Sequence, residues 1–278
     1  MPPSSREAPI MGETQLAPYR VTARNIAIAS ENKIHDDAVA RQFGFAGGLV
    51  PGVEVYAYMT HAAVEHWGRA WLEHGTAECR FLKPVYDGEQ VTVTGKVANG
   101  GLDLAVATEA GVCAGGRAGL PGGASSSSDG FEPILPPATR PAADEQTLAP
   151  GTRLGTTPFR PSAEFAARYL ADVAETHPIY ARDRLCHPGI LLRLCNWALT
   201  QNVVLGPWIH AGSTVRNFAV ARVGDELAVR ALVTANYERK GHRMVDLDAL
   251  ILANGHTPVA GIAHTAIWRP RQRAPHTT

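Results

Sequence analysis

The same pattern of landmarks occurs twice in this chain of 278 residues, once in each half. The repeated pairs, each separated by 137 positions, are Pro51-Gly52 with Pro188-Gly189 and Phe81 with Phe218. In both halves the Pro-Gly pair begins an apolar run, and a strand-like segment then ends in the phenylalanine. Two landmarks at one spacing favour an internal duplication. The fold must therefore pair two similar units, each made by about half of the chain.

Each unit is predicted to contain one buried helix. In the first half, the run from Val53 to about Trp67 is apolar on nearly every side. Its apolar residues are Val53, Val55, Tyr56, Tyr58, Met59, Ala62, Ala63 and Val64. A helix without a polar face is buried, and at ~1.5 Å per residue this one is about 22 Å long. The second half repeats the feature from Ile190 to about Val204.

Segments with the alternation of strands surround both helices. In the first half they are 19–23, 76–81, 89–97, 102–108 and 112–118, and in the second half 213–218, 226–233, 244–252 and 258–268. The pattern of 165–173 fits either a helix or a strand. The chain therefore predicts an α+β protein in which strands wrap two buried helices.

Charge and cysteine content argue against several classes of partner. Basic and acidic residues number 26 each, so the formal net charge is zero, and we expect no nucleic acid and no anionic membrane as partner. No apolar run reaches the ~18 residues of a membrane helix, and the N-terminus lacks the apolar core of a signal peptide. We expect a cytoplasmic protein with free, buried cysteines. These are Cys79, Cys113, Cys186 and Cys195.

A polar segment, a short helix and a glycine-containing loop precede the first buried helix. They are Ser30-Glu31-Asn32-Lys33-Ile34-His35, then Asp36 to about Phe43, then 45–52. Pro51 has no N–H, so Gly52 and Val53 offer the first free donors at the positive end of the helix. Gly52 has no Cβ, which lets a negative oxygen approach these donors. His35 is a candidate general base, because imidazole is neutral near pH 7.

This stretch resembles the signature of the MaoC-like hydratase/dehydratase family, which has the hotdog fold. The family pattern is roughly D-x-N-P-[IL]-H-x-D-x-x-x-A, followed by an aliphatic-His-Gly turn that begins the central helix. The matching residues are Asn32, Ile34, His35, Asp37, Ala40 and the turn Val50-Pro51-Gly52. Three positions depart from the pattern. Ser30 stands where the family has its first Asp, Lys33 replaces the Pro, and Pro51 replaces the His of the turn.

The resemblance and the duplication together imply a double hotdog, two tandem repeats that each wrap a curved antiparallel sheet around a central helix. The expected parts are a disordered N-terminus (1–16), an N-terminal hotdog with the site (17–120), a flexible linker (121–157), a degenerate C-terminal hotdog (158–270) and a tail (271–278). In the degenerate copy, Glu175 falls at the place of Ser30 and Tyr180 at that of His35. The repeats would form an internal pseudo-dimer, and a further homo-oligomer stays open.

The resemblance also implies a function. A lyase of fatty acid metabolism would add or remove water across the 2,3 bond of an acyl thioester, with acyl-CoA as substrate and no cofactor besides that coenzyme A. His35 would act on the water, and Ser30 would stand in the place of the acid. Gly52 and Val53 would bind the thioester oxygen. Asn32 would orient the site and Tyr56 would line an acyl tunnel, although such a tyrosine is more often part of the core.

Two other functions fit the same residues. A hotdog thioesterase would direct water to the carbonyl carbon instead of C3. A non-catalytic acyl-thioester-binding protein would keep the shape of the site without its acid, because Ser30 carries no charge. Single residues also have simpler interpretations, with His35 as a residue beside a helix and Gly52 as a plain helix start. Arg239, Lys240 and Arg243 would either meet the phosphates of coenzyme A or form a solvated turn.

Overall fold

The computed structural model describes residues 14–121 and 130–271 of the chain, and all statements below refer to these residues. Most of the predicted disordered N-terminus, residues 122–129 near the start of the predicted linker and nearly all of the predicted tail lie outside them.

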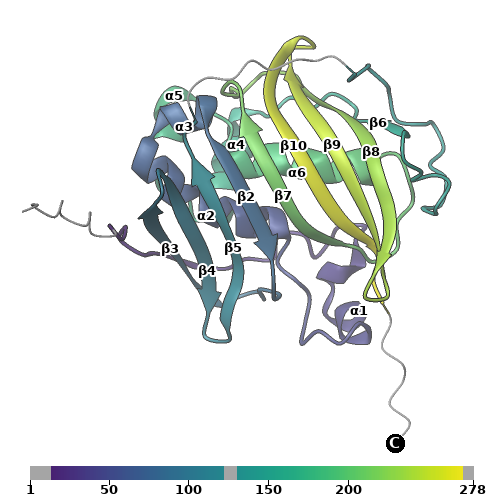
Figure 1. Ribbon diagram of the computed structural model, residues 1–278, viewed down its shortest axis with the longest axis horizontal. Coiled ribbons are helices and arrows are strands. Elements are labelled where there is room, and N and C mark those ends of the chain that lie inside the picture. The colour runs from purple at the N-terminus through teal and green to yellow at the C-terminus, as the bar shows by residue number, and fades with distance from the viewer. Residues whose placement is uncertain (1–13, 122–129, 272–278) are drawn as a thin grey trace, which may run out of the picture.

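One antiparallel sheet of ten strands runs through both halves, in the order β1-β3-β4-β5-β2-β7-β10-β9-β8-β6 (Figure 1). The first half contributes β1 (Tyr19–Thr22), β2 (Thr76–Phe81), β3 (Gln90–Ala98), β4 (Gly101–Thr108) and β5 (Gly111–Gly119). The second contributes β6 (Arg153–Gly155), β7 (Ile209–Asn217), β8 (Leu227–Arg239), β9 (His242–Ala253) and β10 (Thr257–Arg269). The halves use the same strand order, outward from a central β2–β7 pair in which Cys79 lies opposite Ser213.

The helices are the 3₁₀ turn η1 (Lys33–His35), α1 (Asp37–Gln42), α2 (Gly52–Trp67), α3 (Arg69–His74), α4 (Ala163–Asp172), α5 (Ile179–Asp183) and α6 (Pro188–Thr200). Of these, α2, α4 and α6 lie behind the sheet in the view of Figure 1. The two apolar runs of the sequence became α2 and α6, and 165–173 falls within α4 and its C-cap. Each half therefore supplies one buried central helix, as predicted.

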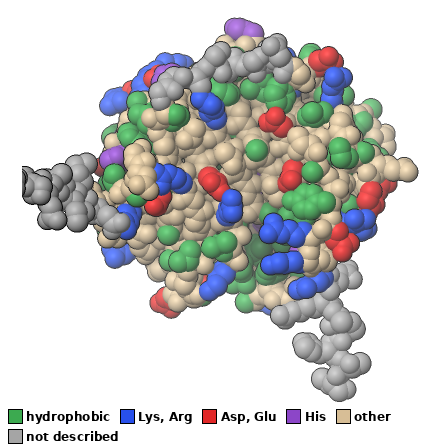
Figure 2. Space-filling model, in the orientation of Figure 1, with side chains coloured by type: hydrophobic (Ala, Val, Ile, Leu, Met, Phe, Trp, Pro, Cys, Tyr) green, Lys and Arg blue, Asp and Glu red, His purple; other side chains and the backbone are tan. Residues whose placement is uncertain are grey.

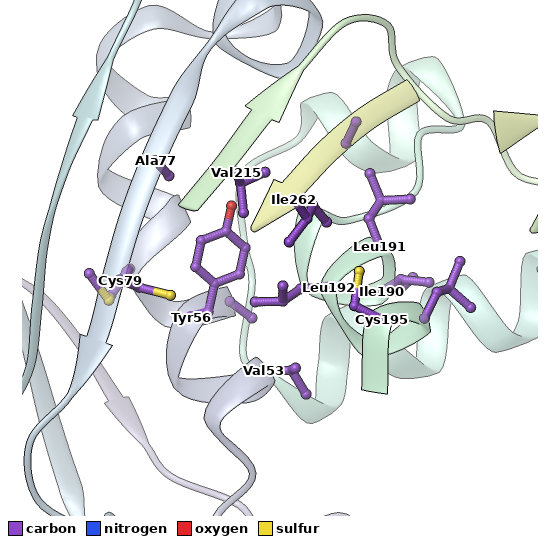
Figure 3. Close-up of a cluster of buried hydrophobic side chains, with 14 of the residues drawn as sticks. Val53, Tyr56, Ala77, Cys79, Ile190, Leu191, Leu192, Cys195, Val215 and Ile262 are labelled. Atoms are coloured by element: carbon purple, nitrogen blue, oxygen red, sulfur yellow. The ribbon is translucent and has the colours of Figure 1, made fainter. Parts of the chain in front are cut away.

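The core fills the space between α2, α6 and the middle strands (Figure 3). Val53 and Tyr56 of α2 lie in this cluster, each 1% exposed, near Leu192 and Cys195 of α6. Burying an aliphatic or aromatic side chain of this size stabilises a fold by about 1.5–3 kcal/mol. The four cysteines are buried and unpaired, as predicted.

One ion pair crosses between the central helices. Glu54 of α2 is 1% exposed and its carboxylate bonds the guanidinium of Arg193 in α6. The Arg193 guanidinium also lies over the ring of Tyr169 at 4.9 Å. A buried carboxylate persists as an ion only when it is paired. The pair therefore links the two halves behind the sheet.

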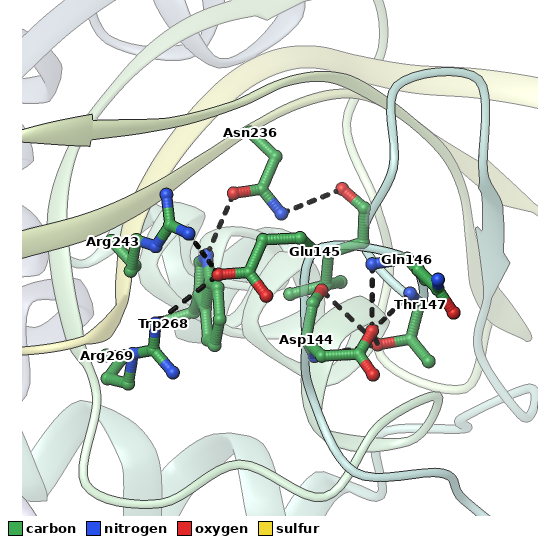
Figure 4. A network of polar contacts seen from close by, with 9 residues as sticks. Asp144, Glu145, Gln146, Thr147, Asn236, Arg243, Trp268 and Arg269 are labelled. Atoms are coloured by element: carbon green, nitrogen blue, oxygen red, sulfur yellow. Dashed lines mark hydrogen bonds and ion pairs between the residues drawn. The ribbon is translucent and has the colours of Figure 1, made fainter.

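The segment before β6 lies against the second half (Figure 4). The Glu145 carboxylate bonds Arg243 and Arg269, which come from β9 and β10. The Asn236 side chain donates to the Leu148 carbonyl at 3.1 Å. These contacts hold residues 144–148 to the sheet. The domain boundaries proposed from the sequence stay predictions.

Candidate active site

A cavity of about 170 Å³ opens at the N-terminus of α2, where the two halves meet. Asn32, His35 and Gly52 line it from the first half, and Asn196, Trp208 and His210 line it from the second. Its lining, within the part of the chain that the structure describes, contains no aspartate or glutamate. The cavity is therefore composite, and its titratable side chains are the two histidines and Lys83.

The loop before α2 is folded tightly enough to hold His35 in place. Asp36 caps α1 by accepting the Val39 N–H at 3.0 Å, and Asp37 accepts the Gly48 N–H at 2.8 Å. A Cβ on Gly48 would come within 2.1 Å of the His35 carbonyl oxygen, so only glycine allows this approach. The loop at Gly48 therefore packs directly against the backbone of His35.

The hydrogen bonds of His35 fix its tautomer. Nδ1 lies 2.7 Å from the Leu49 carbonyl oxygen, which can only accept, so Nδ1 carries the proton. Nε2 is then unprotonated, and its lone pair accepts a hydrogen bond from the Asn32 side-chain nitrogen at 3.3 Å. Burial lowers the pKa of His35, and the Leu49 carbonyl offsets only part of this effect. The imidazole is therefore neutral near pH 7 and has the form that a general base requires.

The Asn32 side chain ties this site to the second half. Its nitrogen donates to the Trp208 carbonyl at 2.9 Å, and its oxygen accepts the Trp208 N–H at 3.1 Å. The oxygen also accepts the Ile34 N–H at 3.3 Å, at the start of η1. Asn32 is thus a structural clamp as well as a partner of His35.

The start of α2 has free donors, as predicted. Among the described residues, no hydrogen bond uses the backbone N–H of Gly52 or Val53. A Cβ on Gly52 would lie 2.9 Å from the Phe81 ring and 3.1 Å from Nδ1 of His210. Phe81 and His210 therefore pack directly against the start of α2, and only a residue without a Cβ fits there without a shift of its neighbours.

Three of the residues singled out from the sequence do not line the cavity with a side chain. Ser30 turns its hydroxyl to the Asn32 carbonyl at 3.2 Å. The side chains of Val53 and Tyr56 lie in the core, which leaves Val53 only its backbone N–H as a candidate contact. Whether these residues bind substrate stays a prediction.

The acids near this stretch in sequence have other partners. Glu31 pairs at the surface with Arg140 at 3.0 Å, and Glu54 pairs with Arg193. Glu65 is exposed and lies 3.9 Å from Nε2 of His177. None of the three lines the cavity of His35. Within residues 14–121 and 130–271, no carboxylate therefore takes the place of the acid that the family pattern has at the position of Ser30.

Sequence reasoning missed His210, which is 5% exposed. Its Nε2 lies 2.9 Å from the Ser213 hydroxyl, while its Nδ1 is buried without a hydrogen-bond partner in the described structure. The available signal was a histidine three residues before the strand expected over 213–218. His210 brings a second imidazole to the cavity.

At the matching place in the second half, the helix start is closed. A Cβ on Gly189 would lie 2.1 Å from the Tyr169 hydroxyl oxygen. Nearby Glu175 is bonded to Nδ1 of His61 at 2.8 Å, and its other oxygen lies 3.5 Å from Nε2 of His187. Burial raises the pKa of this carboxyl, but the two histidines and the His177 N–H outweigh burial and lower it.

A second, larger cavity of about 770 Å³ adjoins the first, because Phe81, Leu82, Ala211 and Ile267 line both. Arg80, Arg239 and Lys240 border it. On the face seen in Figure 2, lysine and arginine side chains gather around a hollow with an apolar floor. A basic entrance therefore leads toward the cavity of His35.

Within the described residues, no group of three or more His, Cys, Asp or Glu side chains is placed to hold a metal ion. No described helix has the length and apolar character needed to cross a bilayer.

Comparisons with known proteins place the fold. No protein-family model and no curated protein matches the sequence. Among solved structures, a MaoC domain protein from Chloroflexus aurantiacus J-10-fl has a TM-score of 0.63 at 12% identity, over 94% of this chain and 96% of that one. Rv0216 of Mycobacterium tuberculosis, described as a double hotdog, has a TM-score of 0.62 at 16% identity, over 90% and 95% of the chains.

A protein from Novosphingobium aromaticivorans DSM 12444 that is named for a thioesterase activity has a TM-score of 0.52 at 13% identity, over 91% and 96% of the chains. At such identities the likeness establishes the fold, which is the double hotdog of the α+β class. The predicted resemblance to MaoC-like proteins is thus confirmed at the level of structure.

Proposed function

We propose that this chain is a MaoC-like hydratase or dehydratase that adds water to, or removes it from, the 2,3 bond of an acyl thioester. One observation carries the proposal. The neutral His35, with its proton held on Nδ1 by Leu49, shares a cavity with the free N–H groups at Gly52. A base and an oxyanion site side by side are what this reaction needs.

In the hydration direction, the long hydrogen bond from Asn32 to Nε2 of His35 breaks, and this nitrogen takes a proton from water as the water oxygen bonds to C3. The C2–C3 double-bond electrons move toward the thioester carbonyl, and the resulting negative oxygen is stabilised by the N–H groups of Gly52 and Val53. The imidazolium then returns its proton to C2. Because none of the described residues brings a carboxylate to the cavity, one histidine performs both transfers. Asn32, 3.3 Å from Nε2, orients the imidazole.

Coenzyme A is the carrier that fits the surroundings best. The cationic groups of Arg239 and Lys240 border the entrance and suit phosphates, whereas Arg80 is paired there with Glu78. A cavity of about 170 Å³ suits a short acyl chain, since an apolar cavity of about 150 Å³ holds a molecule the size of benzene. Crotonyl-CoA is therefore the first substrate to test.

The test follows the loss of enoyl absorbance with crotonyl-CoA for wild type, His35→Ala and His256→Ala. His256 is an exposed histidine outside the cavity and controls for the loss of an imidazole. We expect turnover in wild type and His256→Ala, and a loss of at least about 100-fold in His35→Ala. Turnover that survives in His35→Ala would contradict the assignment of the base.

A thioesterase is the second candidate, because the cavity lacks the acid and one solved structure with this fold carries a thioesterase name. The same base would then direct water to the carbonyl carbon. Release of free thiol from butyryl-CoA, which has no double bond to hydrate, identifies that activity. Binding of either thioester without turnover would identify a non-catalytic carrier or sensor.

A further inference from the structure

A buried chain of polar groups extends from the cavity into the second half. His210 and Ser213 on β7 and His264 on β10 are each at most 6% exposed. The Ser213 hydroxyl lies 2.9 Å from Nε2 of His210 and 3.0 Å from Nδ1 of His264. The two imidazoles stack with 4.3 Å between ring centroids. The free ends of the chain are Nδ1 of His210 and Nε2 of His264, both without a partner in the described structure.

A β-bulge brings these groups together. Along β10, Thr265 lies opposite Gly212 and Ala266 lies opposite His210, so Ala211 is an extra residue in β7. Residues three apart on a regular strand face opposite sides of the sheet. The extra residue puts His210 and Ser213 on the same, inner side, and bulges commonly re-aim a side chain in this way.

The free nitrogen of His210 lies close to the start of α2. A Cβ built on Gly52 would lie 3.1 Å from this Nδ1, and both residues line the same cavity. The unpartnered nitrogen is therefore beside the residue whose N–H is one of the first free donors of the helix. A buried polar atom without a partner marks a place where a ligand's polar atom would complete the hydrogen bonding.

We propose that His210 is a third hydrogen-bond donor to the acyl carbonyl oxygen, beside the Gly52 and Val53 N–H groups, and that Ser213 and His264 hold it in the donating tautomer. The inference rests on the proposed function, because the oxygen is that of its acyl thioester. A carbonyl oxygen only accepts, so its binding selects the form with the proton on Nδ1 of His210. Ser213 then donates to Nε2 of His210 and accepts from Nδ1 of His264, so each hydrogen bond in this chain has one donor and one acceptor.

Electrostatics favour a donor over a base at this position. Burial and the neighbouring His264 lower the pKa of His210 well below its usual range, and the Gly212 carbonyl offsets little of this effect. Burial lowers the pKa of His264 to about 4. A histidine with such a pKa stays neutral and is a weak base. A neutral imidazole can still polarise a carbonyl by donating its N–H, as in triosephosphate isomerase.

The test uses a non-hydrolysable probe, the ketone analogue of butyryl-CoA in which a methylene replaces the ester sulfur, labelled with ¹³C at its carbonyl. In wild type we expect the ¹³C signal to move downfield on binding, and ¹⁵N spectra of the imidazoles to report His210 protonated on Nδ1. In His210→Phe most of the downfield shift should disappear. Ser213→Ala should keep part of that shift and give a mixture of His210 tautomers.

Kinetics supply the second measurement. If wild type hydrates crotonyl-CoA, His210→Phe should lower kcat by about 10²–10³ with little change in KM, as for one oxyanion donor. His210→Asn, which retains an N–H, should recover part of the loss. His256→Phe is the control and should resemble wild type in every measurement.

The outcomes separate the two proposals. Failure of wild type to bind the ketone would overturn the acyl thioester function and this inference with it. Binding with the same carbonyl signal in wild type and His210→Phe would overturn the inference alone. A downfield shift that depends on His210 supports the inference even if no hydration is detected. If His210→Phe does not fold, a proton on Nε2 instead of Nδ1 in ligand-bound wild type would overturn it.

Discussion

The Asn32 side chain and the Trp208 backbone exchange two hydrogen bonds, of 2.9 and 3.1 Å, across 176 residues of chain. The same amide contacts Nε2 of His35, so one side chain both joins the halves and positions the candidate base. Removing it should therefore affect stability and activity together.

We expect Asn32→Ala to lower the free energy of unfolding by about 2–3 kcal/mol, because the Trp208 N–H and C=O lose their partners. Turnover should fall at least tenfold. Asn236→Ala is the matched control, since Asn236 also bridges two segments, donating to Leu148 and accepting from Trp268 (Figure 4). It should cost similar stability and keep turnover. Urea unfolding and initial rates measure both, and equal activity losses in the two variants would contradict the role of Asn32.

Gly52→Ala should abolish most activity with a small effect on folding. The new methyl would press on Phe81 at 2.9 Å and occupy the space beside the free N–H groups. We expect kcat/KM to fall at least 100-fold, while the melting temperature changes by a few degrees. Gly206→Ala is the control, because a Cβ there meets nothing within 4 Å. Full activity in Gly52→Ala would rule out an oxygen site at this helix start.

The rate should depend on pH through His35. Its pKa is lowered from 6.5 by burial, and the base must be unprotonated. We therefore expect kcat/KM to rise with pH, to reach half of its maximum below about pH 6.5 and to be level near neutrality. Initial rates between about pH 5 and 8 measure this. An ascending limb centred above the ordinary pKa of histidine would assign the titration to another group.

Acid should destabilise the fold through its buried histidines. His264 has a pKa of about 4 in the folded state against 6.5 in the unfolded chain. The unfolded state therefore binds a proton first, and stability is lost as pH falls from about 6.5 toward 4. At pH 5 this histidine alone accounts for about 2 kcal/mol. His264→Phe should flatten the dependence of unfolding free energy on pH by about that amount, and an unchanged slope would contradict the assignment.

Removal of one member of the Glu54–Arg193 ion pair should lower the free energy of unfolding more than removal of both. Arg193→Met leaves the carboxylate of Glu54 buried without its partner, which we expect to cost about 3–5 kcal/mol. The double variant Glu54→Leu/Arg193→Met should lie within about 1–2 kcal/mol of wild type, since apolar groups of similar size replace the ions. Chemical denaturation of wild type, Glu54→Leu, Arg193→Met and the double variant tests this, and additive losses would show that the ions do not interact.

The strands and central helices were predictable because their signals are local. Alternation located seven of the nine expected strands within two residues at each end, and the apolar run after Pro51 became α2. The other two strands contain bulges that interrupt the alternation. One was expected to begin at Ser213, whereas β7 begins at Ile209, and the other was expected to end at Val233, whereas β8 continues to Arg239. The three-residue strand β6 lies in a Pro-rich stretch and gave no periodic signal.

The lining of the candidate cavity was predictable only in the part that one segment builds. His35, Asn32 and Gly52 line one cavity, as expected from a short motif. Trp208 and His210 reach the same cavity through the pairing of β2 with β7, which no local pattern encodes. Tyr56 shows that even a residue next to the motif could not be placed from the sequence. A helix that is apolar all round does not reveal which of its sides meets a cavity, and Tyr56 lies in the core.

The tyrosine that closes the helix start at Gly189 has a consequence for how the duplication works. In a symmetric dimer of identical chains, a residue that blocks one site also blocks the other. A residue that lines one cavity likewise lines both. Tandem repeats in one polypeptide escape this constraint. Here the second half has no opening at its own helix start, and its residues line the cavity of the first half instead. A calorimetric titration should accordingly count one ligand for each chain, although the architecture has two equivalent places.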